Sequence, residues 1–195
     1  MPTSAWPEAR VESQDQLDPR TDAQLVADIN AGDAAAFEVL YFRHRDWVVS
    51  LACRFTSSED LALDVMQETF IYFLKKFPGF RLTANLKTFL YPAVRNLSIA
   101  ARRKSHRYQS GEAEQTLLAN LPSAAATPET GDLAIVLANL SEEHREVLLL
   151  RFVDGLSLAE ISTAMHIPLG TVKSRLHNSL EQLRQDPRTK EFFEP

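Results

Sequence analysis

The chain has 195 residues, of which 45% are hydrophobic and 24% charged, values that are ordinary for a globular protein. Its length allows one large or two small domains. No apolar run approaches the roughly 18–20 residues that cross a bilayer, and no signal-peptide pattern opens the chain. We therefore expect a cytoplasmic protein without membrane insertion. The single cysteine, Cys53, is expected to be a buried small hydrophobe rather than a nucleophile.

The net charge of −5 argues by itself against binding to nucleic acid, but the charges are segregated along the chain. No basic residue occurs from 55 to 74, and no acidic residue occurs from 86 to 111. The first stretch carries four acids: Glu59, Asp60, Asp64 and Glu68. The second carries five of the cations: Arg95, Arg102, Arg103, Lys104 and Arg107. An acidic and a basic surface on one domain predict two different partners.

The N-terminal elements follow a proline-containing arm at residues 1–20, which shows no periodicity and is expected to be flexible. Thr21, with Gln24 three residues later, predicts a capped helix that ends at Gly32. From 33 to 55 the apolar residues repeat at helical spacing. Three aromatic residues lie on this stripe and are expected to belong to the core: Phe37, Trp47 and Phe55.

The acidic stretch predicts a helix from 59 to 77, capped by Ser57 or Ser58 and ended by Pro78-Gly79. The helix dipole accounts for acids in the first turn. It does not account for Asp64, Gln67 and Glu68, which would project together from the middle of the helix. Such a patch is either a protein-binding surface or merely a solvated face.

A further helix follows a connection at 80–84, with Thr83 or Asn85 as its cap. Pro92 lies inside the helical pattern and would kink the helix or split it in two, because proline removes one backbone donor. Cations at a helix C-terminus are favoured by the dipole, but five without a compensating acid exceed that need. A phosphate-binding surface is the better interpretation.

Residues 105–130 are rich in Ala, Ser, Thr, Gln and Pro and predict a flexible linker, which fully extended would span on the order of 80 Å. Helical patterning resumes at 132, and Ser141 predicts the cap of another helix. We therefore expect an all-α fold, with two small helical domains at 21–104 and 131–186 joined by the linker. A short tail follows at 187–195.

The stretch 156–180 is typical of a helix-turn-helix. Ser157 with Glu160 forms a capping box, and Pro168 suits the first turn of the following helix. That second helix buries an apolar side: Val172, Leu176, Leu180 and Leu183. Its other side is polar and partly cationic: Thr171, Lys173, Ser174, Arg175, His177, Asn178 and Glu181. Such a helix can enter a DNA major groove, although two amphipathic helices of an all-α core remain the alternative.

Two blocks of this sequence, in this order, resemble the conserved regions of a known family. Residues 60–70 with 86–99 are similar to the second conserved region of bacterial RNA polymerase sigma factors. Residues 145–152 through 170–177 are similar to the fourth region. A chain that has these two regions and no other conserved region resembles the extracytoplasmic-function group of the sigma-70 family. The resemblance covers roughly residues 21 to 186.

The resemblance implies a role for each surface. The acidic helix would bind the clamp helices of the polymerase β′ subunit through Asp60, Asp64, Gln67 and Glu68. The loop at 80–85 and the helix after it would open promoter DNA and recognise the minus-ten element, where a base is flipped into a pocket. The residues implied there are Asn85, Lys87, Phe89, Arg95, Asn96, Arg102, Arg103 and Lys104. The second helix of the helix-turn-helix would bind the minus-35 element through Thr171, Lys173, Ser174, Arg175, His177 and Asn178.

The resemblance also implies partners. These are the polymerase core, including its β flap, promoter DNA and an anti-sigma factor, with no cofactor, no metal and no catalytic activity. The chain departs from the family at four positions: Phe89 for tryptophan, Ala100 for aspartate, Asn178 for a basic residue, and Pro92. Asn178 should favour adenine over guanine and removes one possible phosphate contact.

Two other hypotheses compete with this one. An operator-binding dimeric regulator shares the helix-turn-helix, but its residues 21–104 would sense a ligand or a phosphorylation. The N-terminal half argues against it, because it lacks an alternating strand–helix pattern and carries separate charged surfaces. An enzyme has little support, since the five histidines show no metal-ligand spacing and no glycine-rich phosphate loop exists. The tail aromatics at 192–193 are expected to pack on the last helix.

Overall fold

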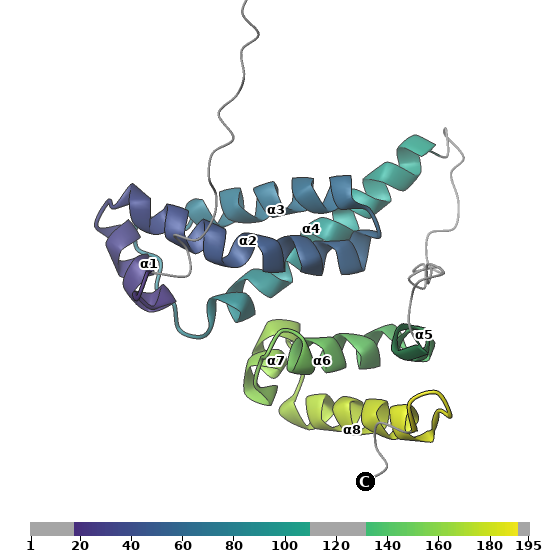
Figure 1. Cartoon of the computed structure of the whole chain (residues 1–195). Helices are drawn as coiled ribbons and strands as arrows, with labels where there is room; N and C mark the ends of the chain where they lie inside the picture. Colours follow the sequence, from purple (N-terminus) through teal and green to yellow (C-terminus); the bar gives the residue numbers. More distant parts are fainter. Residues whose placement is uncertain (1–17, 110–131, 191–195) are drawn as a thin grey trace, which may run out of the picture.

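The computed structural model describes residues 18–109 and 132–190, and every regular element within these ranges is a helix. The expected all-α fold is confirmed (Figure 1). The helices are α1 Asp22–Asn30, α2 Ala34–Thr56, α3 Glu59–Leu74, α4 Leu86–Gln109, α5 Asp132–Asn139, α6 Glu142–Phe152, α7 Leu158–Met165 and α8 Leu169–Gln185. The tail aromatics, most of the predicted arm and most of the predicted linker lie outside the described residues.

The helix starts follow from local capping, as the sequence predicts. Thr21 and Ser157 each form a complete capping box with the residue three positions later. Ser58 and Ser141 cap α3 and α6 with one side-chain bond each. The ends are less regular: α3 stops at Leu74, three residues before the predicted end, and α4 continues five residues beyond 104.

Helices α1 to α4 form the N-terminal domain, in which α2, α3 and α4 pack on one another. Its centre holds fully buried side chains from all four helices, among them Leu25, Leu51, Phe73 and Leu90. Phe37 packs edge-on against Phe70 at 6.3 Å between ring centroids, so its core role is confirmed. Phe55 is also buried.

Helices α5 to α8 form the C-terminal domain. Helix α8 packs along α6, and a small cluster of Val136, Leu148 and Leu183 lies between them and α5. Buried Ser179 ties the two long helices together, since its hydroxyl donates to the His144 carbonyl at 3.1 Å. The turn of the helix-turn-helix is made by His166, whose φ of +55° ends α7 in the left-handed region.

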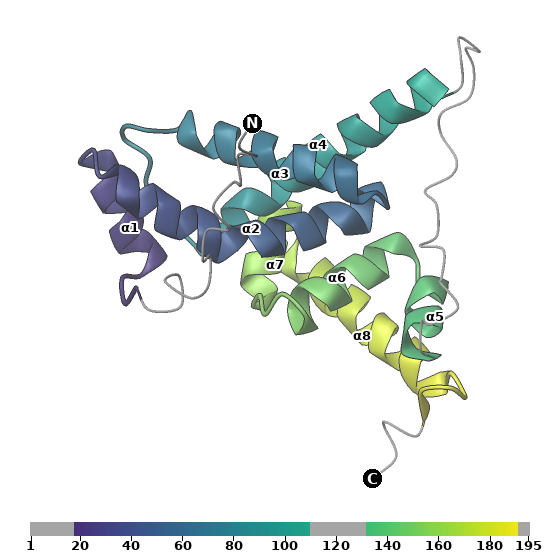
Figure 2. The same ribbon diagram turned by 45° about the horizontal axis from the view of Figure 1, so that its top comes forward.

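The two domains pack against each other, which the sequence did not predict. Helix α7 lies on α4, and α6 lies beside α2 (Figure 2). The buried residues Leu150, Leu156 and Ile161 join one continuous apolar core with the N-terminal domain. Helix α3 packs on α2 and α4, on the side of that domain away from the C-terminal domain (Figure 1).

Pro92 does not split α4, which runs unbroken from Leu86 to Gln109, so that part of the prediction is wrong. Proline removes one donor from the helix ladder, and a helix packed on several sides tolerates this loss. The neighbours Tyr91 and Val94 are at most 1% exposed, which holds the helix in place through the proline. Among the described helices, none combines the length and the apolar character that crossing a membrane requires.

Candidate functional site

The exposed side of α3 brings together the predicted acidic residues. Asp60, Asp64, Gln67 and Glu68 are all exposed, while Val65, Phe70 and Phe73 on the opposite side are buried. Within the described part of the chain these four polar side chains make no hydrogen bond or ion pair. Exposed apolar side chains lie on the same helix: Leu63, Ile71, Tyr72 and Leu74. We call this mixed acidic and apolar surface the α3 face, and an exposed apolar patch with a polar rim is typical of a protein-binding site.

The start of α4 carries the first predicted minus-ten residues. Asn85 caps the helix, since its Oδ1 accepts the Lys87 backbone N–H at 3.0 Å. Phe89 is half-buried in an aromatic cluster, 4.7 Å from Phe80 and 6.1 Å from Tyr72 between centroids. It therefore supports the domain core, and its outer edge also borders the loop before α4.

The cations further along α4 fall into two groups. Arg95 and Arg102 have partners: the Arg95 guanidinium lies 3.3 Å from the Glu146 carboxylate, and that of Arg102 donates to the Phe55 carbonyl at 3.3 Å. Arg103 and Lys104 are exposed one turn beyond and make no hydrogen bond or ion pair with described residues, and Asn96 is exposed as well. The predicted phosphate-binding set is thus available only in part.

The loop between α3 and α4 is held by a residue that the sequence pattern did not single out. The Asn30 side chain donates to the Phe80 carbonyl at 2.8 Å and accepts the Gly79 N–H at 2.6 Å. Gly79 has a φ of +99°, a conformation that favours glycine. Because Asn30 lies some fifty residues away at the end of α1, no local spacing could reveal it.

Helix α8 presents most of its predicted DNA-binding residues to solvent. Lys173, Ser174, His177 and Asn178 are exposed, and Thr171 is half-buried. Arg175 differs, because it forms a 2.5 Å ion pair with Glu143 and its side chain is only 19% exposed. Five of the six residues can therefore meet a ligand directly, whereas Arg175 is held against α6.

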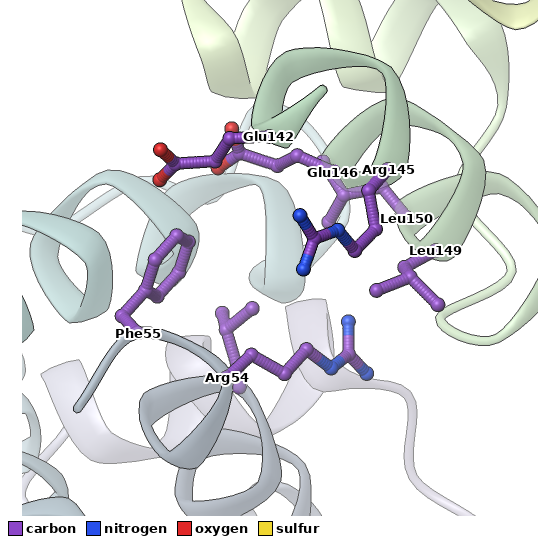
Figure 3. A pocket seen from close by; sticks show the side chains of 8 residues that line it. Arg54, Phe55, Glu142, Arg145, Glu146, Leu149 and Leu150 are labelled. Atoms are coloured by element: carbon purple, nitrogen blue, oxygen red, sulfur yellow. The ribbon is translucent and has the colours of Figure 1, made fainter. Parts of the chain in front are cut away.

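Two carboxylates at the domain boundary, Asp154 and Glu146, were not predicted as functional residues. Asp154 lies two residues after the end of α6, and Glu146 lies within that helix, where it borders a cavity of about 60 Å³ (Figure 3). Arg54 and Phe55 of α2 line the same cavity from the other domain. Burial raises the pKa of Glu146 to about 7, with nearby Arg175 acting in the opposite direction.

The described residues offer no group of three or more histidine, cysteine, aspartate or glutamate side chains that could hold a metal ion. Cys53 is a half-buried thiol rather than a fully buried one. Its pKa is raised by burial and by the charge of Glu59. A raised pKa lowers the thiolate fraction, which fits the expectation that Cys53 is not a nucleophile.

Both predicted regions match family models. Residues 40–108 match the model described as Sigma-70 region 2, and residues 136–185 match that described as Sigma-70, region 4. The chain is similar in fold to CnrH, solved in complex with the cytosolic domain of CnrY, with 21% identity and a TM-score of 0.60 over 83% of this chain and 93% of that one. It is similar to a sigma factor RpoE, solved with the anti-sigma factor NepR from Bartonella quintana, with 23% identity and a TM-score of 0.56 over 76% and 94%.

Curated relatives extend this likeness over most of the chain. An ECF RNA polymerase sigma-E factor of Escherichia coli is 30% identical over 178 residues, which cover 84% of this chain and 92% of the relative. The ECF RNA polymerase sigma factor SigW of Bacillus subtilis is 29% identical over 177 residues, covering 84% and 95%. With both regions matched in the expected order, the chain belongs to the extracytoplasmic-function group of the sigma-70 family.

Proposed function

We propose that this chain binds RNA polymerase core and directs it to promoters, where it recognises two DNA elements and begins strand separation. The observation that carries this proposal is the presence of both sigma regions, each on its own helical domain. The protein is a regulatory transcription factor that supplies specificity, and the chemistry of RNA synthesis belongs to the polymerase.

The α3 face is the proposed site for the β′ clamp helices. Its exposed acceptors, Asp64, Gln67 and Glu68, have no partner among described residues that must first be displaced. Its exposed apolar side chains, Leu63 and Ile71, would supply contact area around those charges. A contact of the C-terminal domain with the β flap would place the second helical unit on the same polymerase.

Helix α4 and the preceding loop form the proposed minus-ten site. Lys87, Arg95, Arg103 and Lys104 would contact phosphates, and the aromatic cluster around Phe89 borders the place where an unstacked base would be held. Unstacking costs a few kcal/mol per base, so aromatic rings that are already held in place beside an unstacked base would favour the opened strand.

Helix α8 is the proposed reader of the minus-35 element. Lys173 would contact a phosphate, and Asn178 would contact a base edge in the major groove, where asparagine pairs well with adenine. The face carries few cations, so it should depend on polymerase to hold DNA. An anti-sigma factor is a further proposed partner, which is supported by two relatives of similar fold that were solved in complexes with a second protein.

The proposal is tested by transcription with purified components. The full chain mixed with polymerase core and a fragment library should give transcripts with a shared promoter sequence upstream of their starts. Core without the chain provides the control. Binding of the chain to operator-like DNA as a dimer, without specific starts in the presence of core, would overturn the proposal in favour of a dimeric regulator.

A further inference from the structure

The connection between α3 and α4, which runs beside the end of α1, has few hydrogen-bond partners (Figure 1). Between Pro78 and Ala84 the described residues form two hydrogen bonds, and both go to the Asn30 side chain. Its amide donates to the Phe80 carbonyl at 2.8 Å and accepts the Gly79 N–H at 2.6 Å. Because a backbone without partners has many accessible conformations, these two bonds select one conformation of the connection.

The chemistry of the two backbone groups calls for an asparagine at position 30. Gly79 presents a donor and Phe80 presents an acceptor, and among side chains of this length only asparagine has an N–H donor and a carbonyl acceptor in one plane. An aspartate here would keep the bond to Gly79, but its second oxygen cannot donate and would face the Phe80 carbonyl. An alanine would remove both bonds.

The helix that carries Asn30 is itself anchored to the domain. The Asp22 carboxylate at its start accepts a hydrogen bond from Arg43 of α2 at 2.7 Å and lies 2.8 Å from His44 Nε2. Leu25 in its middle is fully buried in the core. The amide therefore holds the connection from a fixed position, as a residue must if it is to support a binding site.

The two bonds also determine which side chains the connection presents to solvent. The Phe80 ring packs into the aromatic cluster, 4.7 Å from Phe89 between centroids, and Leu82 packs partly against the core. Arg81 and Thr83, which alternate with them, are exposed. A rotation of the backbone at residues 79–80 would move both sets of side chains, and the bonds to the amide oppose that rotation.

We infer that Asn30 is a positioning residue of the proposed minus-ten site. By holding the backbone at Gly79 and Phe80 it fixes the surface beside which an unstacked base is held, and thereby sets the base preference at one position of the opened strand. This inference rests on the proposed function and deepens it. The amide is engaged on both sides, so it acts through the connection and not by contact with the base. Neither bond involves a residue of the α3 face, so binding to polymerase core does not depend on Asn30.

The experiment uses the full chain bound to polymerase core and a pool of DNA duplexes, each with a short unpaired bubble of random sequence. Sequencing of the bound duplexes measures the base preference at every bubble position. We expect the wild-type chain to favour one base about tenfold at one or more positions. Asn30→Ala and Asn30→Asp should reduce the preference at one of these positions to less than about twofold, while core affinity and any preference elsewhere are retained.

A second variant tests the connection from the other side of the hydrogen bond. Gly79 has a φ of +99°, and a Cβ added there would meet no atom within 4 Å. Gly79→Ala therefore acts through backbone conformation alone and keeps the Asn30 side chain. We expect it to weaken the base preference at the same bubble position as Asn30→Ala, which would link the amide to the conformation of the connection.

Two variants of α1 serve as matched controls. Asp28→Asn loosens the same helix, because the Asp28 carboxylate pairs with Arg20 at 2.8 Å, but Asp28 has no hydrogen bond to the connection. Ala27→Asp adds, at an exposed position, the same negative charge as Asn30→Asp. Both controls should keep the wild-type preference at every position, since general loosening or added charge changes affinity for all sequences alike.

Three results would overturn the inference: wild-type preference in both Asn30 variants, wild-type preference in Gly79→Ala, or an equal loss of preference in Asp28→Asn. Weaker core binding by the Asn30 variants would also overturn it, because their defect would then be a general one. The proposed function fails differently, since the wild-type chain with core would then show no base preference at any bubble position.

Discussion

The α3 face and the cationic side of α4 are both charged helical surfaces of the N-terminal domain, yet they differ in their contacts with the rest of the chain. The acids of α3 are exposed and unpaired within the described residues, whereas Lys87 and Arg95 of α4 are engaged by carboxylate-bearing residues of the other domain. A surface without internal partners is ready for an external one. A surface with internal partners can bind an external ligand only after those partners are displaced.

The largest effect is expected from charge reversal on the α3 face. Asp64→Lys with Glu68→Lys should weaken binding to polymerase core about 100-fold, because like charges placed opposite each other cost several kcal/mol. Binding to single-stranded DNA should change far less. Glu38→Lys with Asp46→Lys makes the same change in net charge on exposed positions of α2 and serves as the control. Equal core affinity for the α3 variant would show that this face is only solvated.

The next effect concerns Phe89, which belongs to both the domain core and the proposed minus-ten site. Phe89→Ala should lower the free energy of unfolding by about 2 kcal/mol, less than the 3–5 kcal/mol typical of a fully buried phenylalanine, because the ring is half-buried. Phe73→Ala provides that larger reference, since Phe73 is 0% exposed. Chemical denaturation checks both. Phe89→Leu, which retains apolar volume, should recover most stability while leaving strand separation impaired; normal melting by this variant would assign Phe89 to the core alone.

The contact between the two domains should weaken as pH rises. The pKa of Glu146 is about 7 where the domains pack together, against an ordinary value of 4.5, so formation of the domain contact takes up a proton between these pH values. The favourable contribution is full below pH 4.5 and is lost as pH rises through 7, which predicts that the ratio of packed to separated domains falls about tenfold from pH 6 to pH 8. Small-angle X-ray scattering of the full chain, which measures the radius of gyration, checks this expectation.

Several charged or titratable groups surround Glu146, so a variant is needed that removes the titration of Glu146 alone. They are Glu142, Glu143 and Arg145 of its own helix, Arg54, Tyr91 and Arg95 of the N-terminal domain, and His166 and Arg175 from the helix-turn-helix. Glu146→Gln mimics the protonated carboxyl and should keep the radius of gyration constant across this range. A pH-dependent radius that survives in this variant would assign the titration to another group.

The smallest effect is expected on α8, in the C-terminal domain. Lys173→Ala should lower affinity of the holoenzyme for promoter DNA a few-fold across sequences and flatten the salt dependence by about one unit. Asn178→Ala should instead relax base preference at one position. A salt slope that does not change in the Lys173 variant would remove that residue from the phosphate contacts.

Local chemistry made much of the fold predictable. Ser157 and Glu160 lie three residues apart and satisfy each other's backbone groups, so their capping box is visible in the sequence. The apolar spacing in α2 and α8 likewise determines which side is buried. The acidic and basic stretches could be assigned to surfaces because each is confined to one helix.

The domain contact could not be predicted in this way. Asp154 meets Arg54 and Trp47 across about a hundred residues, and nothing in its own neighbourhood distinguishes it from a turn residue before Gly155. Arg175 was predicted to face DNA from its position on α8, but its pairing with Glu143 depends on how α8 packs on α6. Pairings of this kind follow from tertiary packing, which a helical period does not encode.

The most direct measurement of the domain contact uses the Trp47 indole N–H, which donates to the Asp154 carboxylate at 2.9 Å. The chain has only two tryptophans, so the full chain labelled with ¹⁵N-tryptophan should give two indole signals, assigned by Trp6→Phe. The domain contact predicts that the Trp47 signal of the free wild-type chain exchanges slowly with solvent and shifts in Asp154→Asn. A Trp47 signal that exchanges rapidly and is unchanged by Asp154→Asn would contradict this contact.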